Sequence, residues 1–375
     1  MRLLLWVLCG VSFNFYTARC GSCSDYPSSF DTAEVRLCWK GRCGISFMHN
    51  CLSDQIWERV TFLSNVTSLK RGAFNNLLDL WFLNISGVGL QRIEPYALHD
   101  LPVISRIILR SNSITVIKNN VFQDSFAEYI DLSYNRIYNL EDQAFSKMSR
   151  LKVLKINNNR IKSINRRLFT RSPNIVALNF ARNEITTLDL NVLLLIRSII
   201  ILDLNFNKIF NVVPVSLESS CSRLLLAGNN VESINFLGKF RIKHLNMAMN
   251  SVTRFDIDFE QLQAGVEFIL HPNPLTCPCL REFEAMGRWI QVKQLLPSSD
   301  TMLAWKKDYP ICVANAKNCS DSDENDSERG RRDYFREIAY HEIINYEVVD
   351  KHYRLDLGSY IATVDLAKHP EPDDF

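Results

Sequence analysis

The sequence predicts an α/β repeat solenoid, in which short coils stack on one another and form one parallel β-sheet, with a cysteine-rich cap at each end. Two observations predict this fold class. One template of apolar residues recurs every 21 to 24 residues along most of the chain. Ten of the 11 cysteines lie before or after that array, where an open solenoid needs a cover. A single unit of this length cannot bury its own apolar face, so stability comes from stacking.

Each unit carries apolar residues at positions 1, 4, 6, 11 and 14. Nine units begin at Leu80, Ile104, Ala127, Leu151, Ile175, Ile199, Cys221, Ile242 and Gly265, and a degenerate first unit lies near residues 56–69. Positions 4 and 6 alternate as in a short strand and should point into the solenoid, whereas positions 2, 3, 5, 7 and 8 should point outward.

Position 9 holds asparagine in eight consecutive units, and its amide can satisfy backbone groups that the turn leaves unpaired. These residues are Asn112, Asn135, Asn159, Asn183, Asn207, Asn229, Asn250 and Asn273. Position 19 is aromatic in four units, where it should fill the convex side of the core: Phe74, Phe122, Phe145 and Phe169.

This pattern resembles the leucine-rich repeat, and the resemblance covers residues 56–319. It implies a curved parallel sheet with a concave face. The segment "NPLTCPCLREFEAMGRWI" resembles the C-terminal cap of extracellular leucine-rich repeat proteins. That likeness implies a helix, a roof formed by Trp289, and disulfides Cys277–Cys312 and Cys279–Cys319. The N-terminal cysteines 23, 38, 43 and 51 resemble the matching cap only loosely, so their pairing stays open.

The chain divides into six predicted segments: a signal peptide at 1–18, ending between 18 and 21; a cysteine-rich cap at 19–55; repeats at 56–275; a second cap at 276–319; a polar linker at 320–332; and a tail at 333–375. The charged start and short apolar run predict secretion. No transmembrane helix is expected, because polar residues interrupt the later apolar run. Candidate glycosylation sites are Asn65, Asn84, Asn318 and Asn325.

Cysteine parity depends on where the signal peptide ends. If Cys20 is removed, the N-terminal cap keeps four cysteines, which can all pair. If Cys20 is retained, one cysteine is left over and could form a disulfide with another chain. The remaining cysteine, Cys221, occupies position 1 of its unit, so we expect a buried thiol that acts as a small hydrophobic side chain.

The tail differs from the body in charge. Residues 320–375 hold 15 Asp and Glu against 7 Lys and Arg, a net charge of −8, whereas the whole chain carries +2. We therefore expect the acidic tail to fold back onto the basic body. The linker sequence "RGRR", with Arg329, Arg331 and Arg332, resembles a furin-type processing site, although a solvated run of charges is the alternative.

The outward positions of the concave face predict a binding surface. Arginines beside aromatic residues are typical of protein-binding hot spots, and a positive field favours acidic partners. The candidates are Arg106, Arg110, Tyr129, Tyr134, Lys152, Lys155, Arg182 and Phe206. A sulfated polysaccharide is a second candidate ligand, and nucleic acid is not expected for a secreted chain. No cofactor or metal site is expected, because the seven histidines are scattered and no nucleophile motif occurs.

Among secreted leucine-rich repeat proteins, the sequence most resembles the insect, particularly mosquito, leucine-rich immune proteins, in a form without their C-terminal coiled coil. The resemblance implies a recognition or scaffold role in innate immunity rather than an enzyme. The alternative is a secreted adhesion, matrix or developmental signalling protein with the same architecture.

Overall fold

The computed structural model describes residues 33–39, 42–48, 57–74, 77–197, 199–214, 219–234, 240–255, 266–270, 273 and 290–292. Several predictions from the sequence lie outside these ranges. They concern the signal peptide and Cys20, the C-terminal cap disulfides, Asn318 and Asn325, the linker with Arg329, Arg331 and Arg332, and the acidic tail.

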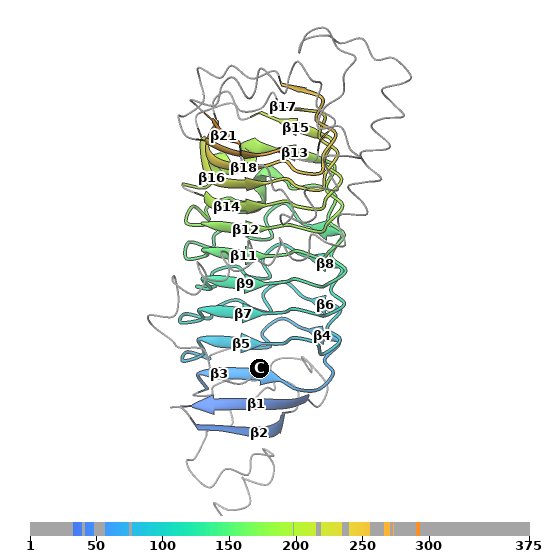
Figure 1. Ribbon diagram of the computed structural model, residues 1–375. Helices are drawn as coiled ribbons and strands as arrows, with labels where there is room; N and C mark the ends of the chain where they lie inside the picture. The colour runs from blue at the N-terminus through green and yellow to red at the C-terminus, as the bar shows by residue number, and fades with distance from the viewer. Residues whose placement is uncertain are drawn as a thin grey trace, which may run out of the picture.

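One long β-sheet runs the length of the described stack, with one strand from each coil (Figure 1). Within the described residues it has thirteen strands. In spatial order they are β2 (Arg42–Met48), β1 (Ala33–Trp39), β3 (Arg59–Phe62), β5 (Phe82–Asn84), β7 (Arg106–Ile108), β9 (Tyr129–Asp131), β11 (Val153–Lys155), β12 (Ala177–Asn179), β14 (Ile199–Asp203), β16 (Ser219–Leu225), β18 (Phe240–Asn246), β20 (Val266–Ile269) and β21 (Ile290–Val292).

Neighbouring repeat strands are parallel and paired in a constant register. Leu154 on β11, for example, lies opposite Ile130 on β9 and Leu178 on β12. The N-terminal end differs, because β1 and β2 form an antiparallel hairpin and β1 also pairs antiparallel with β3. Cys38 on β1 is disulfide-bonded. The hairpin therefore covers the sheet edge that the first repeat would otherwise leave open.

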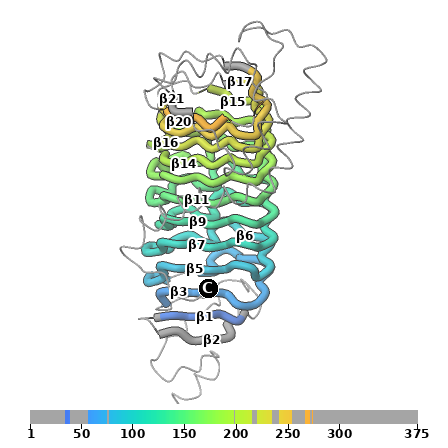
Figure 2. Tube along the Cα trace, viewed as in Figure 1, coloured from blue at the N-terminus to red at the C-terminus, as the bar shows by residue number. Residues whose placement is uncertain are grey.

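The opposite side of the coils carries short elements (Figure 2). Four parallel two-stranded pairs lie there: β4 (Ser68–Leu69) with β6 (Arg92–Ile93), β8 (Val116–Ile117) with β10 (Asn139–Leu140), β13 (Thr187–Asp189) with β15 (Asn211–Val213), and β17 (Ser233–Ile234) with β19 (Arg254–Phe255). Two 3₁₀ helices lie on the same side, η2 (Arg166–Phe169) and η3 (Leu190–Leu195). The described ranges contain no α-helix. The predicted solenoid of parallel strands is confirmed, with 3₁₀ turns on its convex side.

No helix among the described residues has the length and apolar content that crossing a bilayer requires.

The core follows the predicted positions. Side chains at positions 4 and 6, such as Ile107 and Leu109, are fully buried. On the convex side, the rings of Phe122 and Phe145 stack with centroids 5.6 Å apart, and those of Phe145 and Phe169 lie 6.4 Å apart. These phenylalanines continue the core from one coil to the next, so their predicted role is confirmed.

The position-9 asparagines form the expected ladder. The Asn159 amide nitrogen donates to the carbonyls of Leu132, in the preceding coil, and of Ile156, each at 3.0 Å. Its Oδ1 accepts the backbone N–H of Ile137, also in the preceding coil, at 2.9 Å. Every position-9 asparagine from 112 to 273 makes the same kind of bonds. Buried turn groups are thereby satisfied by a neighbouring coil.

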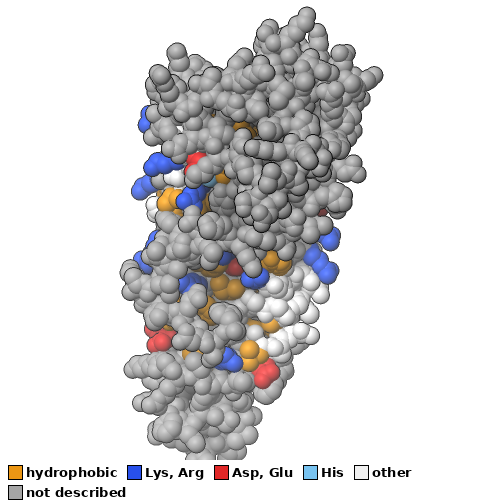
Figure 3. Space-filling view, viewed as in Figure 1, with side chains coloured by type: hydrophobic (Ala, Val, Ile, Leu, Met, Phe, Trp, Pro, Cys, Tyr) orange, Lys and Arg blue, Asp and Glu red, His pale blue; other side chains and the backbone are white. Residues whose placement is uncertain are grey.

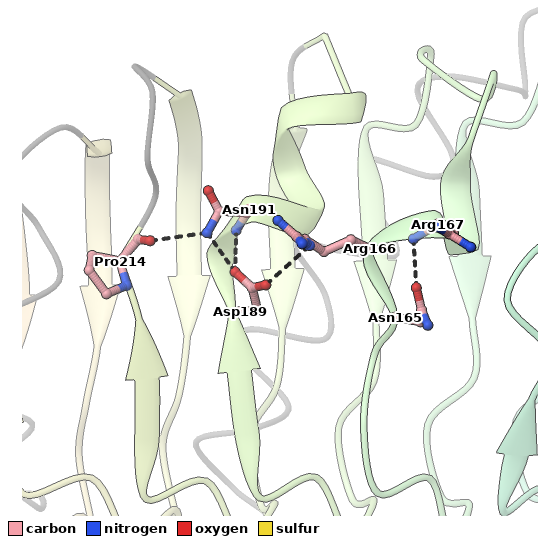
Figure 4. A network of polar contacts seen from close by, with 6 residues as sticks. All are labelled: Asn165, Arg166, Arg167, Asp189, Asn191 and Pro214. Atoms are coloured by element: carbon pink, nitrogen blue, oxygen red, sulfur yellow. Dashed lines mark hydrogen bonds and ion pairs between the residues drawn. The ribbon is translucent and has the colours of Figure 1, made fainter.

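A second polar network joins coils on the convex side (Figure 4). Asp189 is the N-cap of η3, and its Oδ1 accepts from the backbone N–H of Asn191 at 3.0 Å and from its amide at 2.7 Å. The other carboxylate oxygen lies 3.6 Å from Nε of Arg166 in the preceding coil. Asn191 also donates to the carbonyl of Pro214 in the following coil at 3.2 Å. Asp189 and Asn191 therefore connect three successive coils.

Cys221 is a free, fully buried cysteine, as its position in the repeat predicts. Its thiol donates to the carbonyl of Arg223 at 3.0 Å. Burial raises the pKa of the Cys221 thiol to about 12, above its ordinary 9.0.

We expect native protein at pH 8 to resist iodoacetamide at Cys221, because the reagent attacks the thiolate and the thiol here is both neutral and enclosed. In urea, the same thiol should react readily. The pKa of Cys221 is higher in the folded chain than in the unfolded chain. The contribution of the neutral thiol to the free energy of unfolding is therefore complete below pH 9.0 and is lost as the pH rises to about 12. Rapid labelling of the native protein, followed by mass spectrometry, would contradict the repeat register.

Candidate functional site

A left-handed residue ends each repeat strand. Position 8 has φ between 55° and 69° in eight units: Gly87, Ser111, Tyr134, Asn158, Arg182, Phe206, Gly228 and Met249. In seven of them the next residue is the ladder asparagine, and after Gly87 it is Val88. Glycine and asparagine adopt this left-handed backbone conformation readily, but it costs other residues about 1 to 2 kcal/mol of conformational free energy. Tyr134, Arg182 and Phe206 therefore occupy a backbone position that disfavours them. Because the same conformation recurs at position 8 of every one of these units, the turn of the repeat imposes it.

Three of these residues, Tyr134, Arg182 and Phe206, take part in two pairs between an arginine and an aromatic ring. The guanidinium carbon of Arg110 lies 4.7 Å from the ring centroid of Tyr134, one coil further on. That of Arg182 lies 4.7 Å from the ring centroid of Phe206, again in the next coil. The second ring is covered on its C-terminal side by Gly228, where an added Cβ would lie 2.6 Å from Phe206 Cδ1. Glycine at this position lets the ring lie flat against the next turn.

Both pairs border a depression in the concave face, which we call the central depression. Its volume is about 230 Å³, and it is lined by outward residues of six consecutive units, on and just after β7, β9, β11, β12, β14 and β16. Its charged side chains are Arg110, Lys155, Arg182, Arg223, Asp131 and Asp203. Four cations against two carboxylates leave a net charge of +2. In the view of Figure 3, Lys and Arg side chains lie beside hydrophobic ones along the described stack.

The two carboxylates of the central depression also belong to turns. Asp131 Oδ1 accepts the backbone N–H of Ser133 at 2.9 Å, and Asp203 Oδ1 accepts that of Asn205 at 3.1 Å. Asn179 makes the same bond to Ala181 at 3.0 Å. Position 5 thus stabilises the turn through a side-chain oxygen. Both carboxylates therefore stabilise turns and also offset part of the positive charge of the depression.

The structure brings five of the eight predicted binding residues to the central depression: Arg110, Tyr134, Lys155, Arg182 and Phe206. The other three lie nearby on the same face but do not line it. Arg106 and Tyr129 are register partners on β7 and β9. Lys152 forms an ion pair with Glu128 at 2.7 Å.

Tyr129 supports Lys155 from beside the depression. The Lys155 ammonium lies 5.5 Å from the Tyr129 ring centroid, and the Tyr129 hydroxyl donates to Asp131 Oδ2 at 3.4 Å. Burial, with a smaller contribution from the Asp131 carboxylate, raises the pKa of Tyr129 above its usual range. Its phenol therefore stays neutral and keeps its hydrogen bond throughout the physiological pH range.

The candidate binding residues did not include Arg223 or the asparagines that line the floor of the depression, Asn157, Asn179 and Asn205. A signal was present, because these residues occupy the outward positions 3, 5 and 7 of their units. Of the predicted glycosylation sites, Asn65 is exposed beside β3, and Asn84 on β5 bonds through Oδ1 to the backbone N–H of Ser86 at 3.1 Å.

Comparison with known proteins agrees with this architecture. Residues 67–194, about a third of the chain, match the family model described as BspA type leucine rich repeat region, in six copies. The chain folds as a leucine-rich repeat solenoid. A comparison with curated proteins found no match. The matching family model describes a repeat rather than an enzyme.

Several solved structures resemble the solenoid at low sequence identity. A leucine-rich repeat protein of Leptospira interrogans is 20% identical, over 58% of this chain and 55% of that one, with a TM-score of 0.44. A chain of the Drosophila Toll–Spatzle complex is 20% identical, over 64% of this chain and 39% of that one, with a TM-score of 0.49. A chain of the mouse RP105/MD-1 complex is 20% identical, over 60% of this chain and 42% of that one, with a TM-score of 0.48. The chain spans about 40 to 55% of the length of these structures.

Proposed function

We propose that this leucine-rich repeat protein is an extracellular, non-enzymatic recognition protein that binds an acidic protein ligand in the central depression. The observation that carries the proposal is the row of arginine and aromatic side chains around that depression. Tyr134, Arg182 and Phe206 hold a left-handed backbone. Two of the rings lie under arginines.

Rigid aromatic residues and arginines supply most of the binding energy in protein interfaces, because they bury large areas with few rotatable bonds. Stacking against the ring fixes each guanidinium before a ligand arrives, which reduces the conformational entropy lost on binding. A carboxylate of the ligand can then pair with Arg110, Arg182 or Arg223 through two parallel hydrogen bonds. The net positive charge accelerates encounter with an acidic surface.

Capture experiments with the secreted protein test this proposal. We expect the change of Tyr134 and Lys155 to alanine together to weaken ligand binding by about 30-fold, the equivalent of about 2 kcal/mol for a hot spot. The matched control changes Tyr138 and Lys162 in the same two units, where both side chains are exposed away from the depression. Equal capture by both double variants would place the ligand elsewhere.

The salt dependence of the same binding separates two ligand classes. A sulfated polysaccharide held mainly by charge should be released as the salt concentration rises, since screening weakens exposed ionic contacts. A protein packed against Tyr134 and Phe206 should keep most of its affinity.

We propose innate immunity as the setting, on the basis of the resemblance to insect leucine-rich immune proteins. Expression induced by infection in haemocytes or fat body is the expected result. Constant expression in neural or epithelial tissue would instead favour an adhesion, matrix or developmental role.

A further inference from the structure

A second group of arginines and aromatic rings lies on the outward face of the first repeats, apart from the central depression. Arg59 on β3, Phe82 on β5 and Arg106 on β7 are register partners, so they form one row across three adjacent strands (Figure 1). All three side chains are half-buried, whereas the inward residue that follows each of them is fully buried. None of the three lines the central depression.

Two aromatic rings hold the Arg59 guanidinium above β5. Its central carbon lies 5.1 Å from the ring centroid of Phe82 and 5.4 Å from that of Trp81. These two rings meet edge to face, with centroids 5.8 Å apart. Adjacent strands lie about 4.8 Å apart, so the α-carbons of Arg59 and Arg106 are separated by about 10 Å. Because Arg59 leans over β5, its charged end is closer to β7, the strand that carries Arg106.

The electrostatics of Arg59 favour the addition of an anion. Burial, and after it the positive charge of Arg106, lowers the pKa of Arg59 below its ordinary value. Neither of these causes is a carboxylate. The Nε atom of Arg59 is enclosed and has no hydrogen-bond acceptor among the described residues. An anion that contacts both guanidiniums would relieve their repulsion, and it would act in a partly dehydrated place where charges interact more strongly than in water.

A sulfate or phosphate group matches this arrangement. A guanidinium donates two parallel hydrogen bonds to a pair of oxygens, and a tetrahedral oxyanion has further oxygens for a second guanidinium. We propose that Arg59 and Arg106 form an oxyanion site, in which a sulfate or phosphate group of a ligand bridges the two guanidiniums above the ring of Phe82. The inference goes beyond the proposed function, because it assigns a further binding site with its own ligand chemistry.

Modification of arginines by phenylglyoxal in the full-length chain tests the site. N-glycans are first trimmed to their first sugar, because Asn84 lies two residues from Phe82 on the same face. The reaction is run in sodium sulfate, phosphate or chloride of equal ionic strength and followed by peptide mass spectrometry. At an anion concentration about ten times the Kd, we expect sulfate or phosphate to slow modification of Arg59 and Arg106 by about tenfold relative to chloride. Modification of Arg160, an exposed arginine of a later unit, should not change.

Two variants separate a shared site from a single reactive arginine. Arg106→Gln removes one guanidinium, so the anion concentration that half-protects Arg59 should rise by about tenfold, since a charge-assisted pair of hydrogen bonds is lost. Arg110→Gln is the matched control, because it removes a guanidinium of the same unit that borders the central depression instead. The half-protecting concentration should then stay within about twofold. Both side chains point outward, so both variants should fold like the natural protein, which circular dichroism checks.

Three results would overturn the inference. The first is equally fast modification of Arg59 in sulfate, phosphate and chloride. The second is equal protection of Arg59 and Arg160, which would show that anions gather over the basic surface as a whole. The third is an unchanged half-protecting concentration in Arg106→Gln, which would assign the anion to Arg59 alone. The experiment uses no protein ligand, so its failure leaves the capture result in the central depression intact. Conversely, a failed capture experiment would not affect the protection of Arg59.

Discussion

Replacing Phe145 by alanine is expected to lower the free energy of unfolding by about 3 to 5 kcal/mol, the usual range for a buried phenylalanine. The ring is fully buried and stacks between Phe122 and Phe169. Its removal would leave a cavity between coils and break the continuity of the convex core. Urea unfolding followed by circular dichroism measures the change.

The control is Tyr138→Ala in the same unit, where the ring is 57% exposed and the expected change is within about 0.5 kcal/mol. Because a repeat array can unfold in parts, hydrogen exchange should locate the loss of protection in the coils around Phe145. Comparable destabilisation by both variants would show that the stacked rings do not connect the coils.

Replacing Asn159 by alanine is expected to destabilise the protein by about 3 kcal/mol, because buried backbone groups lose their partners at about 1 to 3 kcal/mol each. The side chain bonds to Leu132 and Ile156 through its amide nitrogen and to Ile137 through Oδ1. Two of these partners lie in the preceding coil, so the effect should extend across the interface between the two coils.

Asn157→Ala is the matched control, two residues away at the outward position 7. Its side chain points to the central depression rather than the core. We expect its stability to stay within about 0.5 kcal/mol of the natural protein. If Asn157→Ala destabilises the chain as much as Asn159→Ala, the ladder does not have the role that its geometry implies.

The sequence was sufficient for the solenoid because the repeat period and the inward positions are set by burial alone. Ile107, Leu154 and Cys221 could be placed in the core from their position in the unit. The left-handed conformation at position 8 could not be predicted, because Tyr134 and Phe206 have no intrinsic preference for it. The turn before the ladder asparagine imposes that conformation, and the repeated geometry overrides the local preference of the residue.

The binding surface was predicted only in outline for a related reason. Outward position identifies which residues face the ligand side, but not which of them converge. Lys152 was a candidate by position and charge, yet its ammonium pairs with Glu128 at 2.7 Å. Arg223 was not a candidate, although the register places it beside Ile201 and within the depression. Such pairings depend on neighbouring coils, which a single repeat does not contain.

Site-specific crosslinking tests the central claim most directly. A photoreactive amino acid replaces Asn157, which lines the central depression, or Lys162, which is exposed away from it in the same unit. The two proteins are irradiated with the captured ligand bound, and crosslinked chains are identified by mass spectrometry. We expect the ligand to be attached from position 157 and not from position 162. Crosslinking from position 162 alone would contradict recognition through the concave face.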